Sequence, residues 1–216
     1  IIAQLMIGRI SDGKNSQTLL SLGIFVISIS LLLLTKAQGF FSLLLLMLFL
    51  RFGSSFFHPI GVGWISRIFK KDKLDWAMGI QSGSADIGAF IAISTTLYIS
   101  EVTSWDYPLF LWSLAGGIVL LSGVYLTSNV KKEFLIVKKI SKRQTIKEAI
   151  NESVIFLKKI KLLVPAFIIS GSCWGVVVTY LPLLLNERTD LSLAAIGLVV
   201  SIWIGIGSIS SIYYGK

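Results

Sequence analysis

Long apolar runs separated by short polar breaks dominate this chain. Each of six runs approaches or exceeds the roughly 20 residues that a helix needs to cross the hydrocarbon core of a bilayer. The pattern predicts six membrane-spanning helices, at residues 17–35, 41–66, 76–99, 105–127, 162–185 and 193–213. Residues 1–7 are typical of the end of an earlier span, and the chain begins with Ile and stops directly after a span. We therefore expect a fragment of an all-α integral membrane protein.

The composition agrees with a lipid environment. Hydrophobic residues make up 54% of the chain, charged residues make up 14%, and the mean hydropathy is +0.81. A soluble domain averages about 25% charged residues. The single cysteine, Cys173, lies within an apolar run. We therefore predict a packing role for it, no disulfide within the chain and no metal cluster built from thiols.

The net charge of +9 is explained by where the cations lie along the chain. If the loop at 8–16 is cytoplasmic, alternation of sides leaves only Lys36 and Arg188 outside, whereas ten Lys and Arg residues between Lys131 and Lys161 lie inside. This is the positive-inside pattern of membrane proteins. We expect anionic membrane lipids, and not nucleic acid, to be the partner of the basic loops, and we expect the protein to lie in the plasma membrane.

One connection, residues 128–161, is long and rich in lysine. Within it, Thr145 and Glu148 match a capping box. Apolar residues then recur at helical spacing, which predicts an amphipathic helix on the cytoplasmic surface. This basic cytoplasmic linker divides the chain into a first half-bundle at 1–127, the linker at 128–161 and the start of a second half-bundle at 162–216.

Three short stretches resemble the major facilitator superfamily of transporters. Gly8-Arg-Ile-Ser-Asp12 is similar to the start of the family's Gly-x-x-x-Asp signature between its second and third helices, although Gly13-Lys-Asn-Ser16 departs from the usual basic continuation. Arg51 falls where the family often has an arginine in its fourth helix. The stretch from Gly79 to Gly88 is similar to the family's glycine-rich fifth helix. More narrowly, residues 51–61, which include Phe57-His58-Pro59, resemble fosmidomycin-resistance-type exporters.

The resemblance implies a major-facilitator-type helical bundle of twelve helices, in two six-helix halves around a central cavity. This chain would cover the end of helix 2 through helix 8 of that bundle. It also implies transport by alternating access around a site near the membrane midplane. In the family, the aspartate that matches Asp12, in the loop that begins at Gly8, belongs to a latch that holds one conformational state. A cap for the following helix is the alternative for Asp12.

Two charges inside apolar runs are the main candidates for function. At a rise of about 1.5 Å per residue, Arg51 lies roughly 15 Å and Asp86 roughly 20 Å below the outer surface. Charges at such depth mark ligand or ion pathways by default. We predict that Arg51 offers a fixed positive site, and that Asp86 is its breakable partner or a protonation site. A salt bridge is expected if their faces meet. The alternative is a permanent ion pair that only neutralises two buried charges.

Several neighbouring residues are further candidates. His58 lies one heptad after Arg51. It could relay protons, although we favour a hydrogen bond to a neighbouring helix, with Pro59 bending the chain just beyond it. Ser82, close to Asp86 in sequence, is a further candidate for contact with a substrate or coupling ion. Small residues let helices approach closely, and we assign this packing role to Gly79, Gly83 and Gly88.

These features favour a secondary transporter that exports a small solute and is coupled to protons. Within that class, the alternative is an uptake symporter for a small organic anion or sugar. An intramembrane enzyme using His58 and Asp86 is a different class, but no nucleophile or metal set accompanies these residues. A non-transporting receptor or scaffold is a third class. The sequence has no Walker-type loop, so we do not expect ATP hydrolysis, and we expect no metal or cofactor.

Overall fold

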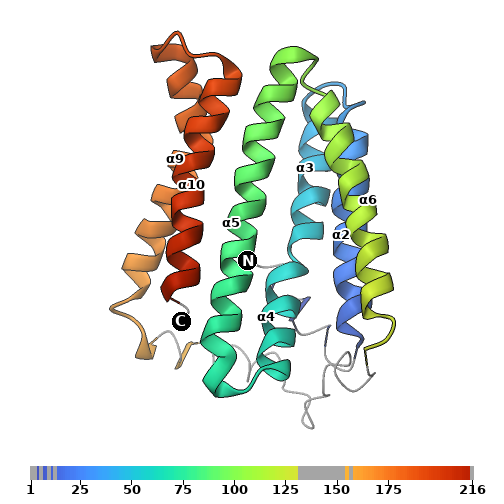
Figure 1. Ribbon diagram of the computed structural model, residues 1–216, viewed down its shortest axis with the longest axis vertical. Helices are drawn as coiled ribbons and strands as arrows, with labels where there is room; N and C mark the ends of the chain where they lie inside the picture. The colour runs from blue at the N-terminus through green and yellow to red at the C-terminus, as the bar shows by residue number, and fades with distance from the viewer. Residues whose placement is uncertain are drawn as a thin grey trace. The chain divides into compact units, whose positions relative to one another are not determined.

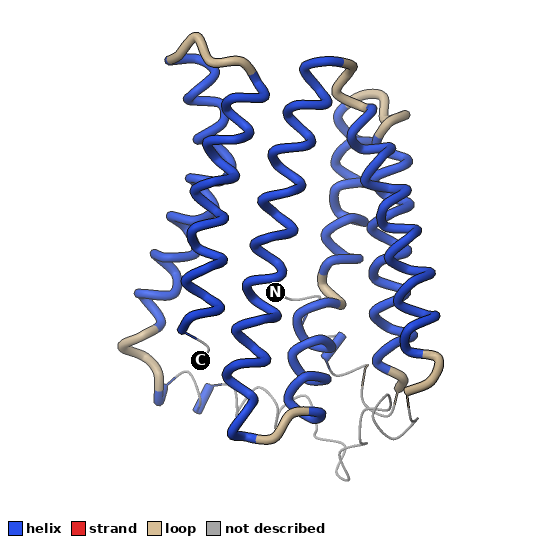
Figure 2. Tube along the Cα trace, in the orientation of Figure 1, coloured by secondary structure: helices blue, strands red, loops and turns tan. Residues whose placement is uncertain are grey.

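The computed structural model describes residues 14–130 and 158–214, together with residues 4, 7, 8, 11, 154 and 155. This part of the chain is helical, and no strand occurs in it (Figures 1 and 2). Its labelled helices are α2 (Ser16–Leu34), α3 (Phe40–Ser54), α4 (Phe57–Ile68), α5 (Lys71–Val102), α6 (Tyr107–Thr127), α9 (Val164–Arg188) and α10 (Leu193–Tyr214).

The six predicted spans are confirmed as helices that are long and apolar enough to cross a membrane. They are Ser16–Leu34, Phe40–Ile68, Lys71–Val102, Tyr107–Thr127, Val164–Arg188 and Leu193–Ser210. The largest difference in bounds is at the start of α5, which begins five residues before the predicted Trp76. The added residues include lysine and aspartate, which hydropathy excludes from a span but which extend a helix readily at the membrane surface.

The second span differs from the prediction of a helix that bends just after His58. It is interrupted between α3 and α4 at Ser55–Phe56, where Figure 2 shows a short tan segment. Pro59 explains the position, because proline has no N–H to donate to the carbonyl four residues earlier and its ring crowds that carbonyl. The carbonyl concerned is that of Ser55. The Phe56 N–H instead donates to the carbonyl of Gly53 at 3.3 Å, a tighter turn than an α-helix makes.

Helix α2 packs against α3 through two glycines. A Cβ atom on Gly23 would lie 2.9 Å from the backbone oxygen of Gly53, and one on Gly53 would lie 2.9 Å from the oxygen of Gly23. These separations are shorter than real contacts allow, so the crossing requires glycine on both helices. Helix α2 also packs against α6, where the Ser113 hydroxyl donates to the carbonyl of Ser28 at 2.8 Å. Small and hydroxylated residues are the usual contacts between membrane helices.

Polar contacts join the other helices of this group. At the ends of α4 and α2, the Arg67 guanidinium donates to the Ser16 hydroxyl at 2.9 Å. Between α6 and α5, the Trp112 indole N–H donates to the Thr96 hydroxyl at 3.1 Å. Both of these donors thereby find an acceptor within the protein, which polar groups in a lipid environment need. A small apolar cluster forms beside them from Ile7, Leu19, Phe56 and Ile60.

The described helices fall into two compact units. Helix α10 belongs to the same unit as α2–α6, and α9 belongs to the other, which covers Ile140–Ser192. Within the first unit, α5 packs most extensively against α10. This grouping by contact crosses the predicted division into 1–127, 128–161 and 162–216, which remains a prediction. The amphipathic helix predicted at Thr145–Leu157 lies mostly outside the described residues.

Candidate functional site

One stripe of α5 faces α10 along most of its length. Backbone or side-chain atoms of Gly83, Phe90, Ile93 and Leu97 lie against α10. These positions are separated by seven, three and four residues, so they fall on one face of a helix with about 3.6 residues per turn. The facing residues of α10 include the fully or nearly fully buried Ile196, Val200, Ser201, Ile204 and Ser208. We call this contact the α5–α10 seam.

Glycines on α10 allow the seam to close. A Cβ atom on Gly197 would lie 2.9 Å from the Leu97 Cβ, and one on Gly205 would lie 3.2 Å from the Phe90 ring. Nearer the C-terminal end of α10, the Ser208 hydroxyl donates to the Gly83 carbonyl at 3.0 Å. On α5, Gly79 and Gly83 are buried, as expected of residues in a close helix contact. The seam therefore combines close backbone approach with a buried hydrogen bond.

Asp86 lies within this seam. It falls between Gly83 and Phe90, about 60° around the helix from the first and about 40° from the second. Its side chain is half-buried. It also stands one heptad after Gly79 and one heptad before Ile93, so it occupies the same helix face as both. The structure thus places an ionisable carboxyl at the edge of a tightly packed helix pair.

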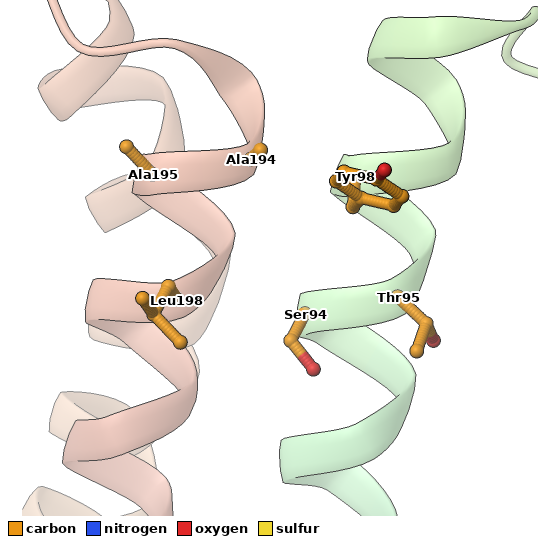
Figure 3. Close-up of a pocket in the computed structure, with 6 residues that line it drawn as sticks. All are labelled: Ser94, Thr95, Tyr98, Ala194, Ala195 and Leu198. Carbon is orange, nitrogen blue, oxygen red and sulfur yellow. The ribbon is translucent and has the colours of Figure 1, made fainter.

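A shallow cavity of about 400 Å³ opens in the part of the seam that lies near the C-terminal end of α5. It is lined by Ser94, Thr95 and Tyr98 of α5 and by Ala194, Ala195 and Leu198 of α10. Figure 3 shows Ser94 on the side of α5 that faces α10 and Ala194 on the side of α10 that faces α5. Two of its three hydroxyls are used locally, because Ser94 donates to the carbonyl of Phe90 and Thr95 to that of Ile91.

Arg51 lies on a different face of a different helix. Its helix, α3, buries Gly53 against α2. Arg51 stands two residues before Gly53, about 200° around the helix, and therefore on the opposite side. Its side chain is exposed.

The predicted salt bridge between Arg51 and Asp86 is not formed among the residues that the structure describes. The two residues have similar depth along their helices, but depth does not fix direction. The Asp86 side of α5 faces α10, whereas α3 buries its own packed side against α2. The structure therefore brings Asp86 to α10 and leaves Arg51 apart from it.

His58 and Ser82 are both exposed. The His58 ring lies edge-to-face with that of Phe57, with 5.8 Å between ring centres. A spacing of one heptad would place His58 and Arg51 on the same face of a continuous helix, but α3 ends at Ser54 and α4 begins at Phe57, so the spacing does not establish this. Ser82 lies one turn before Asp86 and outside the buried part of the seam.

Gly88 differs from the other two glycines predicted to pack. It is exposed, and a Cβ atom there would meet nothing within 4 Å in the described part of the chain. The reason is its position, about 200° around α5 from Phe90, which lies in the seam. Burial thus supports packing at Gly79 and Gly83, and the hydrogen bond from Ser208 supports it further at Gly83, whereas neither supports it at Gly88.

The loop before α2 is described only in part. Gly8 is half-buried, its carbonyl accepts a hydrogen bond from the Ser11 hydroxyl at 2.6 Å, and a Cβ atom on it would lie 3.7 Å from the Cβ of Pro59. Gly8 therefore lies beside the start of α4. Asp12, the predicted latch residue, lies outside the described residues. Among those that are described, no group of three or more His, Cys, Asp or Glu side chains is placed to hold a metal ion.

Comparison with known proteins decides the family. The family model of the Major Facilitator Superfamily matches residues 1–216. This chain belongs to the major facilitator superfamily. No curated protein and no solved structure matched it.

Membership explains the architecture described above. Proteins of the major facilitator superfamily are multi-pass membrane proteins, and their general function is secondary transport. The six apolar helices of this chain are such spans. For a transporter, a carboxyl within a helix seam is a more specific candidate than an isolated charge, because movement of the two helices changes its surroundings.

The sequence did not lead us to most of the α10 residues in the α5–α10 seam. Gly197, Ser201, Gly205 and Ser208 were not singled out, although they repeat at intervals of three or four residues along the last apolar run. That spacing of small residues is the signal that could have identified a packed face. Glu101, whose contact is described below, was not singled out either.

Proposed function

We propose that this protein exports a small solute in exchange for protons, by alternating access, and that Asp86 is the residue that binds the proton. The observation that supports this proposal is the position of Asp86, which is half-buried in the seam between α5 and α10. A carboxylate in such a place is costly to enclose, whereas a neutral carboxyl is much less so. We infer that the charge of this carboxyl is linked to whether the seam is closed or open to water.

The predicted organisation of the chain gives this switch a mechanical consequence. In the proposal, residues 1–127 and 162–216 belong to two halves that rock against each other, joined by a cytoplasmic linker at 128–161 in the plasma membrane. Helix α5 comes from the first half and α10 from the second. A change in charge at their seam then acts on the contact between the halves. It does not need the ion pair with Arg51 that the sequence suggested.

Export is favoured over uptake by the likeness of residues 51–61 to fosmidomycin-resistance-type exporters. Arg51 supports a second candidate, uptake of a small organic anion together with protons. Its guanidinium is exposed within an apolar segment and forms no ion pair among the described residues. A fixed positive charge so placed is suited to a carboxylate or phosphate. Both candidates use a small-molecule substrate, protons and surrounding lipid as partners.

Transport by the purified protein in liposomes tests the function. Solutes from a panel of cationic, anionic and neutral compounds are loaded, and their movement is followed with and without an imposed pH gradient. For export by exchange, a solute should move against the direction of proton flow. Co-movement of solute and protons would instead support uptake. If the transport rate of every solute that the protein moves is the same with and without the pH gradient, proton coupling is contradicted.

A further inference from the structure

The carboxylate of Glu101 lies at the start of α10. Its Oε2 atom accepts a hydrogen bond from the backbone N–H of Ala194 at 2.6 Å. Glu101 is in the last turn of α5, and Ala194 is the second residue of α10. The first N–H groups of a helix have no partner within that helix. A carboxylate at this end also interacts favourably with the helix dipole.

This contact differs in kind from the rest of the seam. Further along, the helices meet through glycines at Gly197 and Gly205 and through the neutral hydrogen bond from Ser208. Among the described contacts between α5 and α10, the bond of Glu101 is the one made by a charged side chain. Charge-assisted hydrogen bonds are shorter and roughly twice as strong as neutral ones. The bond is also near the surface, where water can replace it when the helices separate.

We propose that Glu101 is a positioning residue that holds the ends of α5 and α10 together at the Ala194 side of the seam, and that this bond breaks when the seam opens there. The cavity beside Ser94 and Leu198 lies directly next to this contact. Separation of Glu101 from α10 would expose that cavity to water first. Loss of the carboxylate should therefore shift the protein toward the conformation that is open at this end. The inference deepens the proposed transporter function, and it rests on that function for its role in the cycle.

A thiol in the seam can report the opening. Ser201 is completely buried on α10, and its hydroxyl has no hydrogen-bond partner among the described residues. Ser201→Cys is therefore a small change at a position that water reaches only if the helices part. The reporter is placed in a Cys173→Ser background, because Cys173, for which the sequence predicted a packing role, is exposed in the structure and would add labelling of its own. Membranes containing the protein are treated with the permeant reagent N-ethylmaleimide, and the labelling rate of Cys at position 201 is measured.

Glu101→Ala should raise the labelling rate roughly tenfold, the effect of removing about one charge-assisted hydrogen bond. Glu101→Gln should give an intermediate rate, because its amide oxygen can still accept the Ala194 N–H without the charge. Asp106→Ala is the matched control. Asp106 is an outer-end carboxylate at the start of α6. Hydrogen bonds from Ser104 and from its own backbone, with the Lys36 charge, lower its pKa, so Asp106 is ionised at neutral pH.

Equal labelling rates in Glu101→Ala and the parent would overturn the proposal. So would an equal increase in Asp106→Ala, since that would indicate general loosening. Thermal unfolding of each variant in detergent identifies loss of fold, and Val200→Cys, at another fully buried position of α10, provides a second reporter if Ser201→Cys is unstable. The labelling needs neither solute nor gradient. If Glu101→Ala raises the labelling rate but the protein shows no proton-coupled transport, the proposed function is rejected, and the role of Glu101 in holding the helix ends together stands.

Discussion

At the scale of single residues, glycines in this protein differ by what a side chain would touch. A Cβ atom on Gly23 would collide with backbone at Gly53, whereas one on Gly117 would meet nothing within 4 Å in the described part of the chain. Both glycines are inside membrane-spanning helices. Replacing each glycine by alanine therefore separates two effects on stability: the loss of a close helix contact at Gly23, and the change in helix propensity alone at Gly117.

Gly23→Ala should destabilise the protein by about 1–3 kcal/mol, the usual cost of inserting atoms into a packed contact. Gly117→Ala should leave stability unchanged or raise it slightly, because alanine favours helix more than glycine. Thermal unfolding of both variants in the same detergent measures the difference. Similar unfolding temperatures for Gly23→Ala and the parent would show that α2 and α3 can move apart without cost.

The sequence was sufficient to identify Asp86 as an embedded charge but not to find its neighbours. An apolar run shows that a charge is inside a span, and residue spacing gives its depth. Which helix it faces depends on the rotation of α5 against the helices around it, and rotation follows from many packing contacts. The pairing with Arg51 was expected only if the two faces met, and for this reason the sequence could not decide it; the described residues show no ion pair between them.

At the scale of elements, the interruption between α3 and α4 is the main departure from the expected helices. The sequence placed a bend just after His58, whereas the structure interrupts the helix at Ser55–Phe56, three to four residues before Pro59. The missing proline N–H acts on the preceding turn. The sequence correctly indicated that Pro59 disturbs the helix, but it placed the disturbance after the proline instead of before it.

Pro59→Ala should join α3 and α4 into one helix, because the new N–H can donate to the Ser55 carbonyl. The amide at position 59 should then be protected in hydrogen exchange. Pro108→Ala is the control, because Pro108 is in the first turn of α6, where a proline removes no intrahelical bond. An unprotected amide at position 59 would mean that other contacts, such as the packing of Phe56, impose the interruption.

At the scale of the whole molecule, the sequence determined the fold class and the family well. Hydropathy gave the number and approximate bounds of the spans, because each one must satisfy its backbone within itself. It did not give the grouping of α10 with the helices of the first half. That grouping depends on contacts between residues more than a hundred positions apart, such as Ser208 with Gly83.

The charge distribution predicts the orientation of the chain, and labelling of single cysteines can test it. In a Cys173→Ser background, Lys36→Cys and Asp190→Cys should react with a membrane-impermeant maleimide added to intact cells. Lys71→Cys should react only after the membrane is opened. All three positions are exposed in the structure, so a difference reports sidedness. Labelling of Lys71→Cys in intact cells would reverse the proposed orientation.

The central claim is that Asp86 couples proton movement to solute movement. The direct test follows internal pH with a dye in liposomes, during transport of a solute identified from the panel. Wild-type protein should move protons in the direction opposite to the movement of the solute. Asp86→Asn should still exchange solute but move no protons, while Asp75→Asn, an exposed carboxylate on the same helix, should behave as wild type. Proton movement by Asp86→Asn at the wild-type rate would contradict the account.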